Sequence, residues 1–303
     1  MNKYSGLEAL LEPDQIKYNE PMKNHTTMKV GGPCDCMVLP VTIEQIQSVI
    51  AFAKENDIPY YVMGNGSNLL VRDEGVHRLI IKIKGGFNHI DVNENELLAC
   101  AGATMPKLAV VAKENSLAGL EFACGIPGTI GGGVRMNAGA YGGELADVLV
   151  DVTYLNEEGD VCVIKKEDMN CSYRHTIFTD HPAWIILQAR FALQPGNLEE
   201  ITEKMEANKA ARISKQPLEY PSAGSVFTRP KGYFVGKLVQ DSGLRGVSVG
   251  GAQVSEKHTG FIINKGGATC ADVLNLIQLV QDTVYEKFQV RLKTEVIVIG
   301  GEE

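Results

Sequence analysis

The sequence predicts an α+β protein of two domains. Its 303 residues are close to the size at which a single hydrophobic core stops growing and chains divide into domains. Segments with helical and with strand periodicity are both present, but they lack the regular βαβ order of a parallel doubly wound sheet. The clearest boundary signal is the turn-forming "QPGN" at residues 194–197. We therefore expect one domain over residues 1–196, in two lobes that meet near residues 60–70, and a second over residues 197–303.

In the first domain, apolar spacing and turn signals predict the elements. A helix is expected over residues 42–57, because apolar residues recur at helical spacing and Thr42 and Gln45 fit a capping box. A second helix, residues 105–116, carries Pro106 in its first turn, where proline is well tolerated. Strands are predicted at residues 58–64, 79–85, 96–102 and 183–193, and a hairpin over residues 148–165 that turns at residues 156–159.

In the second domain, residues 198–214 form a polar segment with helical propensity. Residues 215–232 are interrupted by Pro and Gly and are predicted to be a loop. Residues 269–288 are the most strongly periodic helix in the chain, and residues 289–300 are predicted to be the last strand.

Composition excludes several classes of protein. The net charge is −8 and no block of five or six like charges occurs, which argues against nucleic acid or an anionic membrane as a partner. No segment approaches 18 consecutive apolar residues, and the N-terminus lacks the apolar core of a signal peptide. The seven cysteines are odd in number and scattered, and the Cys34-x-Cys36 pair has no second ligand pair at zinc spacing. We expect free thiols, no metal site and a cytoplasmic location.

Two glycine-rich segments are the main functional signal. Eight glycines fall within the nineteen residues from Gly125 to Gly143, and a shorter turn, "GNGSN", covers Gly64 to Asn68. Glycine permits positive φ and close approach of the backbone to a ligand. Either segment alone could be an irregular surface loop, but two such loops suit an extended diphosphate. Neither the P-loop pattern nor the Rossmann G-x-G-x-x-G fingerprint is present. The side-chain donors expected near the ligand are Asn65, Ser67, Asn68 and Asn137.

A set of motifs in a fixed order resembles a known family. The segments "NHTTMKVGG", "GNGSNLL", "GIPGTIGGGVRMNAGAYGGE", "SYRHT", "PSAGSVF" and "KTEV" closely resemble those of the UDP-N-acetylenolpyruvoylglucosamine reductases. The resemblance runs from about residue 20 to the C-terminus. The chain is similar to the compact form of that family, because the segment between Tyr173 and Ser225 is too short for the insertion of the longer form.

This resemblance implies an FAD-binding domain of the p-cresol methylhydroxylase type in two lobes, followed by an α+β substrate-binding domain. FAD would be tightly but not covalently bound, NADPH would donate the hydride, and a UDP-sugar would be the substrate. The implied FAD contacts are Gly64, Asn65, Gly66, Ser67, Asn68, Leu69, Gly125, Pro127, Gly128, Thr129, Gly131, Gly132, Asn137, Ala138 and Gly139.

The resemblance also implies three catalytic residues. Arg174 in "SYRHT" would hold the substrate carboxylate as negative charge develops on it. Ser225 in "AGSVF" would donate the proton, and Glu295 in "KTEV" would act with Arg174 on the enolate. Period-two alternation places Glu295 on the polar side of its predicted strand. Taken singly, each of these residues is more typical of an exposed surface or a turn.

Six further residues lie in segments similar to the family's substrate-binding segments. Arg229 is the best candidate for the substrate phosphates. One position departs from some relatives, which carry an arginine two residues after the catalytic glutamate where this chain has Ile297. The implied substrate contacts are Lys215, Arg229, Lys237, Gln253, His258 and Asn264.

Two other functions remain open on the sequence. Another FAD oxidase or dehydrogenase of the same fold could act on a different substrate, although the presence of Arg174, Ser225 and Glu295 disfavours it. A nucleotide-binding protein without activity would keep the glycine-rich loops but would not need those three residues. A purified flavoprotein is yellow and a plain UDP-sugar binder is not, so colour distinguishes the two classes.

Overall fold

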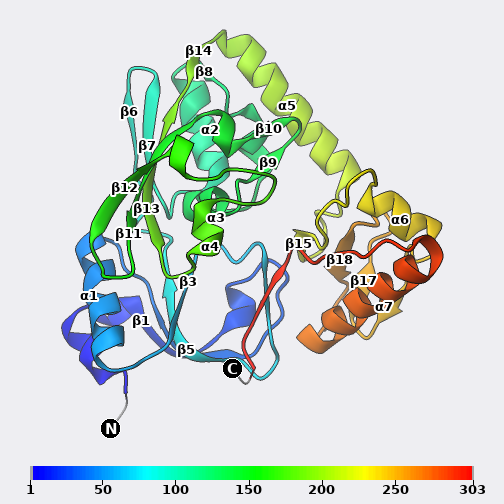
Figure 1. Ribbon diagram of the computed structural model, residues 1–303, viewed down its shortest axis with the longest axis horizontal. Coiled ribbons are helices and arrows are strands. Elements are labelled where there is room, and N and C mark those ends of the chain that lie inside the picture. The colour runs from blue at the N-terminus through cyan, green and yellow to red at the C-terminus, as the bar shows by residue number, and fades with distance from the viewer. Residues whose placement is uncertain (1–2, 302–303) are drawn as a thin grey trace. The chain divides into compact units, whose positions relative to one another are not determined.

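The computed structural model describes residues 3–301 and divides into two compact units (Figure 1). The first unit contains the chain up to Lys17 together with Cys36–Asn65 and Arg78–Arg212. The second contains Tyr18–Asp35, Gly66–His77 and the chain from Ile213 onward. Each unit has its own hydrophobic core. The polypeptide therefore passes between the units several times.

The break between the units differs from the boundary expected at residues 196/197. Helix α5 (Leu198–Lys215) begins after the "QPGN" turn, and the units divide near the other end of that helix. Its earlier turns belong to the first unit, where Asn208 Nδ2 donates to Glu121 O at 3.1 Å. A Pro/Gly turn marks where a helix begins, whereas tertiary packing decides which core the helix joins.

The first unit is built on a five-stranded sheet of order β12-β11-β13-β7-β6, with every neighbouring pair antiparallel. Most residues of the central strand β13 are buried, as its apolar sequence predicts. At the turn between β11 and β12, Asn156 Oδ1 accepts hydrogen bonds from the N–H groups of Gly159 and Asp160, and the predicted hairpin is confirmed. The strands are β6 (Ile90–Asn93), β7 (Glu96–Cys100), β11 (Leu149–Leu155), β12 (Val161–Lys165) and β13 (Ile185–Ala192).

In the first unit the threonine cap predicted for α1 is confirmed, but the reciprocal bond of the predicted capping box is not formed. At α1, Thr42 Oγ1 accepts from the N–H of Gln45 at 3.2 Å, while Gln45 Oε1 accepts from Val41 rather than from Thr42. At α2, Thr104 is the N-cap and Pro106 lies in the first turn. The helices other than α5 are α1 (Ile43–Glu55), α2 (Met105–Glu114), α3 (Ile130–Arg135) and α4 (Ile177–Asp180).

A four-stranded sheet of order β1-β2-β5-β3 contains three strands, β1, β2 and β5, along which the chain passes from one unit to the other. β3 and β5 are parallel, and both were predicted. These strands are β1 (Ile16–Pro21), β2 (Pro33–Val38), β3 (Tyr60–Met63) and β5 (Val76–Lys82). Short antiparallel pairs of the first unit are β8 (Leu117–Ala118) with β14 (Gln194–Pro195), and β9 (Gly139–Ala140) with β10 (Gly143–Glu144).

The second unit has an antiparallel sheet of order β15-β18-β17-β16. α7 (Cys270–Phe288) is the predicted long helix; it begins at a capping box formed by Thr269 and Asp272 and contacts β16 and β17. α6 (Val235–Asp241) contacts α7. The strands are β15 (Ser222–Ser225), β16 (Ser248–Val249), β17 (Ala252–Val254) and β18 (Phe261–Asn264), and β4 (Leu69–Val71) pairs in parallel with β19 (Ile297–Ile299).

Two predictions for the second unit are wrong in part. The expected loop over residues 215–232 contains β15, which pairs with β18 despite the surrounding glycines and prolines. The expected strand over residues 289–300 forms a ladder only at β19, with one isolated bridge between Thr294 and Phe227. Both differences arise because a strand needs a partner that is distant in sequence.

The seven cysteines are free thiols, as expected. Burial raises the pKa of Cys34 to about 11 and that of Cys270 to about 12, so both are protonated at neutral pH. Within residues 3–301, no helix is long and apolar enough to span a lipid bilayer.

Candidate functional site

The two glycine-rich segments meet in the first unit. Asn65 Nδ2 donates to Pro127 O at 2.6 Å, and a Cβ atom added at Gly64 would collide with Thr129 Oγ1. Gly64 is therefore glycine because another loop approaches its backbone, not because of its own φ. The sequence prediction that these loops act together is supported by this contact.

The rest of the shorter loop belongs to the second unit. Gly66 has a φ of 65°, which favours glycine, and its carbonyl accepts the N–H of Thr27 at 3.3 Å. Thr27 Oγ1 is buried and has no hydrogen-bond partner among the described residues. A buried hydroxyl without a partner is rare in proteins, and it points to a bound group that forms the missing hydrogen bond. Sequence reasoning missed Thr27, since nothing in "NHTTMKVGG" separates it from the neighbouring Thr26.

Three asparagine side chains of these loops are hydrogen-bonded to main-chain atoms. Asn65 donates to Pro127 O, as described, and Asn68 Nδ2 donates to Glu295 O at 2.9 Å. Asn137 is only 1% exposed; its Nδ2 donates to Ser172 O at 3.1 Å and its Oδ1 accepts from the N–H of Ala146 at 3.0 Å. These amides therefore shape the loops themselves, and Asn137 has little surface left for a ligand.

The remaining predicted cofactor residues differ in exposure. Gly131 donates its N–H to Ala101 O at 2.9 Å and Gly128 O accepts from Met105 at 3.1 Å, so the segment is tied to the start of α2. Pro127 and Gly132 are exposed, whereas Leu69 and Ala138 are buried. The half-buried members are Gly125, Gly128, Gly139 and Ser67.

These loops fit a diphosphate-bearing cofactor. A diphosphate needs hydroxyls and main-chain N–H groups with few bulky side chains around them. The structure provides glycines where the two loops meet within the first unit. No carboxylate belongs to the predicted cofactor residues, which is also compatible with an anionic group.

Arg174 lies in a tight turn of the first unit. Ser172 and His175 exchange two main-chain hydrogen bonds of 3.0 and 3.1 Å, so Tyr173 and Arg174 are the two central residues. Arg174 has a φ of 58°, a left-handed conformation that is unusual for a residue with a Cβ atom. Its Nη2 donates to Gly139 O at 3.1 Å, and its guanidinium lies 4.9 Å from the centre of the Tyr173 ring. The predicted catalytic arginine is thus held against the glycine-rich segment.

Ser225 and Glu295 are brought together in the second unit. Ser225 is the last residue of β15 and is exposed, and Glu295 is half-buried. The N–H of Glu295 donates to the carbonyl of Val226, the residue after Ser225, at 2.7 Å. The two predicted catalytic residues therefore stand on paired segments, while Arg174 belongs to the first unit.

The predicted cationic substrate residues are exposed. Lys215 is the last residue of α5, and Lys237 pairs with Asp241 at 2.7 Å across one helical turn. Arg229 Nε donates to Tyr233 O at 3.2 Å, and its guanidinium lies 4.0 Å from the centre of the Phe234 ring. Arg229 is thus oriented by its own loop.

The other predicted substrate residues are partly or wholly buried. Gln253 Nε2 donates to Gly246 O and to Ser248 Oγ, both at 3.1 Å, while its Oε1 is buried without a partner in the described chain. Burial lowers the pKa of His258, so its neutral form is favoured. Asn264 donates to Met28 O at 3.2 Å and accepts from Gly266 and Ala268, which makes it a structural residue of its turn. Ile297 is 45% exposed on β19.

Arg212 on α5 was also missed by sequence reasoning. A Cβ atom at Gly125 would lie 2.9 Å from Arg212 Cδ, so the arginine stem covers the first glycine of the long segment. Burial lowers the pKa of Arg212. The spacing of Met205, Asn208 and Arg212, which face residues 121–125, follows one helix stripe and could have indicated this contact.

Comparison with known proteins covers both halves of the chain. Residues 34–165 match a family model described as an FAD binding domain, and residues 216–299 match one described as the C-terminal domain of UDP-N-acetylenolpyruvoylglucosamine reductase. The sequence is 49% identical to the UDP-N-acetylenolpyruvoylglucosamine reductase of Alkaliphilus oremlandii over 302 residues, covering 100% of this chain and 99% of the relative. It is 47% identical to the enzyme of that name from Clostridium botulinum over 307 residues, with the same coverage.

A solved structure agrees with these sequence matches. The crystal structure of UDP-N-acetylenolpyruvylglucosamine reductase from Thermus caldophilus superposes with a TM-score of 0.80 at 35% identity. The match covers 94% of this chain and 98% of that one. The predicted fold class, an FAD-binding domain joined to the family's C-terminal domain, is confirmed.

Proposed function

Because the chain belongs to the UDP-N-acetylenolpyruvoylglucosamine reductase family, we propose that it reduces UDP-N-acetylglucosamine enolpyruvate to UDP-N-acetylmuramate, with FAD as cofactor and NADPH as electron source. The chain is a flavin oxidoreductase of peptidoglycan-precursor synthesis. The observation that carries this assignment is identity of 49% along the entire chain, so that neither domain is matched alone.

The glycine-rich loops would hold the cofactor. The approach of Gly64 to Thr129, both in the first unit, supports a site for the FAD diphosphate. FAD, when bound, supplies the hydride that is added to the terminal vinyl carbon of the substrate. The side chain of Asn137 is buried and fully used, so at that position any contact with the cofactor would come from the neighbouring main chain.

Arg174 would bind the carboxylate of the enolpyruvyl group. Addition of a hydride to the terminal carbon sends the electron pair of the double bond onto the adjacent carbon and its carboxylate. A guanidinium presents five N–H donors in a planar fork, so a bond to Gly139 O is compatible with two parallel bonds to a carboxylate. Charge stabilisation of this kind typically contributes about 10²- to 10³-fold in rate.

Ser225 would complete the reaction by protonating the adjacent carbon. Its exposed hydroxyl at the end of β15 can reach a bound ligand, and the proton leaves Oγ as the new C–H bond forms. Glu295, on the segment paired with Val226, would act on the same enolate together with Arg174. The pairing of these two segments supports a joint role for Ser225 and Glu295.

The exposed cations of the second unit would bind the UDP diphosphate. Arg229 is the strongest candidate, since the Phe234 ring and Tyr233 O orient its guanidinium. Lys215 and Lys237 are exposed and can approach an anionic ligand. Gln253, with a buried oxygen lacking a partner in the described chain, and His258 are proposed contacts for the uridine or sugar.

An anaerobic experiment tests this function. The purified holoenzyme is reduced with NADPH, mixed with UDP-N-acetylglucosamine enolpyruvate, and followed at the oxidised flavin band. We expect the band to return rapidly in the wild type and much more slowly in Ser225→Ala, while reduction by NADPH is unchanged. A yellow protein whose reoxidation ignores this substrate would favour another flavin enzyme of the same fold. A colourless protein that binds no added FAD would favour a nucleotide-binding protein without redox activity.

A further inference from the structure

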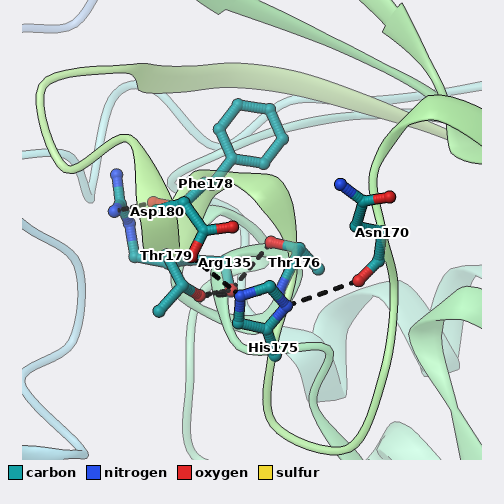
Figure 2. Close-up of polar contacts among 7 residues, drawn as sticks. All are labelled: Arg135, Asn170, His175, Thr176, Phe178, Thr179 and Asp180. Atoms are coloured by element: carbon teal, nitrogen blue, oxygen red, sulfur yellow. Dashed lines mark hydrogen bonds and ion pairs between the residues drawn. The ribbon is translucent and has the colours of Figure 1, made fainter.

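The turn that carries Arg174 is fastened to the glycine-rich segment by side chains of that segment. Asn137 Nδ2 donates to Ser172 O, at the first residue of the turn. Arg135 Nη2 donates to Trp184 O at 2.7 Å, and its Nη1 donates to Phe178 O. Figure 2 draws the contacts of Arg135 with Thr176, Phe178 and Thr179. Residues 135–139 thus contact the chain on both sides of Arg174.

The contacts also run in the opposite direction. The hydroxyls of Thr176 and Thr179 both donate to the carbonyl of Arg135, at 2.8 and 2.9 Å (Figure 2). Arg174 itself donates to Gly139 O. Residues 135, 137 and 139 therefore all form hydrogen bonds with residues between 172 and 184, and all of these residues belong to the first unit.

The conformation of Arg174 requires such support. A left-handed φ is unfavourable for a residue with a Cβ atom, because the Cβ atom comes too close to the following carbonyl oxygen. Such a conformation persists only where its surroundings determine it. Residues on both sides of the turn are fixed, by Asn137 at Ser172 and by Arg135 at Thr176.

The side chains of Arg135 and Asn137 are committed to main-chain groups of the first unit. Asn137 is 1% exposed, and both ends of its amide are bonded to main-chain groups. The guanidinium of Arg135 bonds two main-chain carbonyls, and burial lowers its pKa. Arg135 is half-buried, and transferring part of a guanidinium out of water to bond carbonyls costs free energy, so we attribute its presence to the geometry that it enforces.

We propose that Arg135 and Asn137 are positioning residues for Arg174, which hold the turn at residues 172–175 so that the guanidinium meets the substrate carboxylate. This inference rests on the proposed role of Arg174 in the reduction. It assigns to Asn137 a task different from direct contact with the cofactor.

The test uses the two half-reactions of the holoenzyme. Asn137→Asp keeps the size of the side chain and its tolerance of a φ of 42°, but replaces the donor to Ser172 O by a carboxylate oxygen. We expect at least about tenfold slower reoxidation by UDP-N-acetylglucosamine enolpyruvate, because small misplacement of a catalytic group is costly. Reduction by NADPH should stay within about twofold, since it does not use Arg174. The matched control is Asn208→Asp, which removes a similar 3.1 Å amide-to-carbonyl bond elsewhere in the unit.

A second readout does not depend on turnover. Modification of Arg174 by phenylglyoxal, followed by mass spectrometry of the holoenzyme, should be faster in Asn137→Asp than in the wild type or Asn208→Asp. In an Arg174→Ala background, Asn137→Asp should slow reoxidation no further, because residues that act as one unit are not additive. If Asn137→Asp does not fold, Thr176→Val removes one bond to Arg135 O at nearly constant size and should give the same pattern.

The outcomes separate the inference from the function on which it rests. Unchanged reoxidation in Arg174→Ala would overturn the proposed role of Arg174. Slow reoxidation in Arg174→Ala, with wild-type reoxidation and labelling in Asn137→Asp and Thr176→Val, would overturn only the positioning role. The positioning role would also be overturned if Asn137→Asp slowed reoxidation equally in the wild-type and in the Arg174→Ala backgrounds.

Discussion

Asn65 donates its amide to the carbonyl of Pro127 at 2.6 Å, which joins two glycine-rich loops that lie 62 residues apart in the sequence. The bond stands next to the position where Gly64 approaches Thr129. Neither loop has the pattern of a common phosphate-binding motif, so the proposed cofactor site depends on their combination.

Gly64→Ala should weaken FAD binding. The added methyl group would collide with Thr129 Oγ1, and separating the loops would cost about 1–3 kcal/mol, as overpacked sites do. FAD affinity of the apoprotein, measured by quenching of flavin fluorescence, should fall by about tenfold or more. Gly236→Ala in α6 is the control for folding, because its new Cβ would make only an ordinary contact of 3.4 Å. If Gly64→Ala bound FAD with wild-type affinity, the loops could separate without weakening FAD binding.

Glu295→Gln should slow the reaction without disturbing the fold. The main-chain bonds from Glu295 to Val226 and from Asn68 to Glu295 do not use the carboxylate and would remain. We expect reoxidation by the UDP-sugar to fall about 10²- to 10³-fold, as for loss of one group that stabilises developing charge. Rapid mixing of the reduced enzyme with the UDP-sugar measures this rate of reoxidation. Lys293→Gln, an exposed neighbour on the same segment, should react at the wild-type rate. A similar loss in both variants would mean that the segment, rather than the carboxylate, matters.

The pair of His175 and Asp180 should make stability depend on pH. Asp180 Oδ1 accepts a hydrogen bond from His175 Nε2 at 3.0 Å, which raises the pKa of His175, with a smaller opposing effect of burial (Figure 2). Its contribution is therefore full below the ordinary histidine pKa of about 6.5 and is lost as pH rises through the raised value. Asp180→Asn should lower the urea midpoint more at about pH 5.5 than at about pH 8.5.

An NMR titration of His175 provides the matching measurement, since Asp180→Asn should bring its pKa down toward the ordinary value. Equal loss of stability at both pH values would mean that Asp180 acts through packing rather than through the protonated imidazole.

Asp73→Ala should destabilise the second unit. Its two carboxylate oxygens accept the N–H groups of Cys270 at 2.8 Å and Ala271 at 2.9 Å, at the start of α7. Loss of a cap at a helix N-terminus typically costs about 0.5–2 kcal/mol. Urea unfolding should show a lower midpoint with an unchanged slope. Glu74→Ala, its exposed neighbour, should unfold like the wild type, and an equal effect in both variants would point to net charge instead.

The sequence was informative where structure depends on neighbouring residues. α1 follows from apolar spacing and the Thr42 cap, and α7 follows from apolar spacing alone; both signals act between residues a few positions apart. β15 and the final segment were assigned incorrectly because their partners, β18 and Phe227, are distant in sequence. Pairing over such distances leaves no local pattern.

The features of the candidate site also divide into those that are visible in the local sequence and those that depend on the folded unit. The glycine-rich loops and the ordered motifs could be predicted, because glycine content and residue order are visible in the chain. The unpartnered hydroxyl of Thr27 and the fastening of Arg174 by Asn137 could not, since burial and hydrogen bonding of one side chain depend on the assembled unit. The alternation around Glu295 indicated its partial exposure but not its partner segment.

The interleaved course of the chain has a consequence for synthesis on the ribosome. Met28, Val30 and Leu70 emerge early, yet they belong to a core whose other members all follow residue 222. β4 cannot pair with β19 until Ile297–Ile299 have been translated. The nascent chain therefore exposes these early apolar segments, accessible to chaperones, until their partners after residue 222 have been translated.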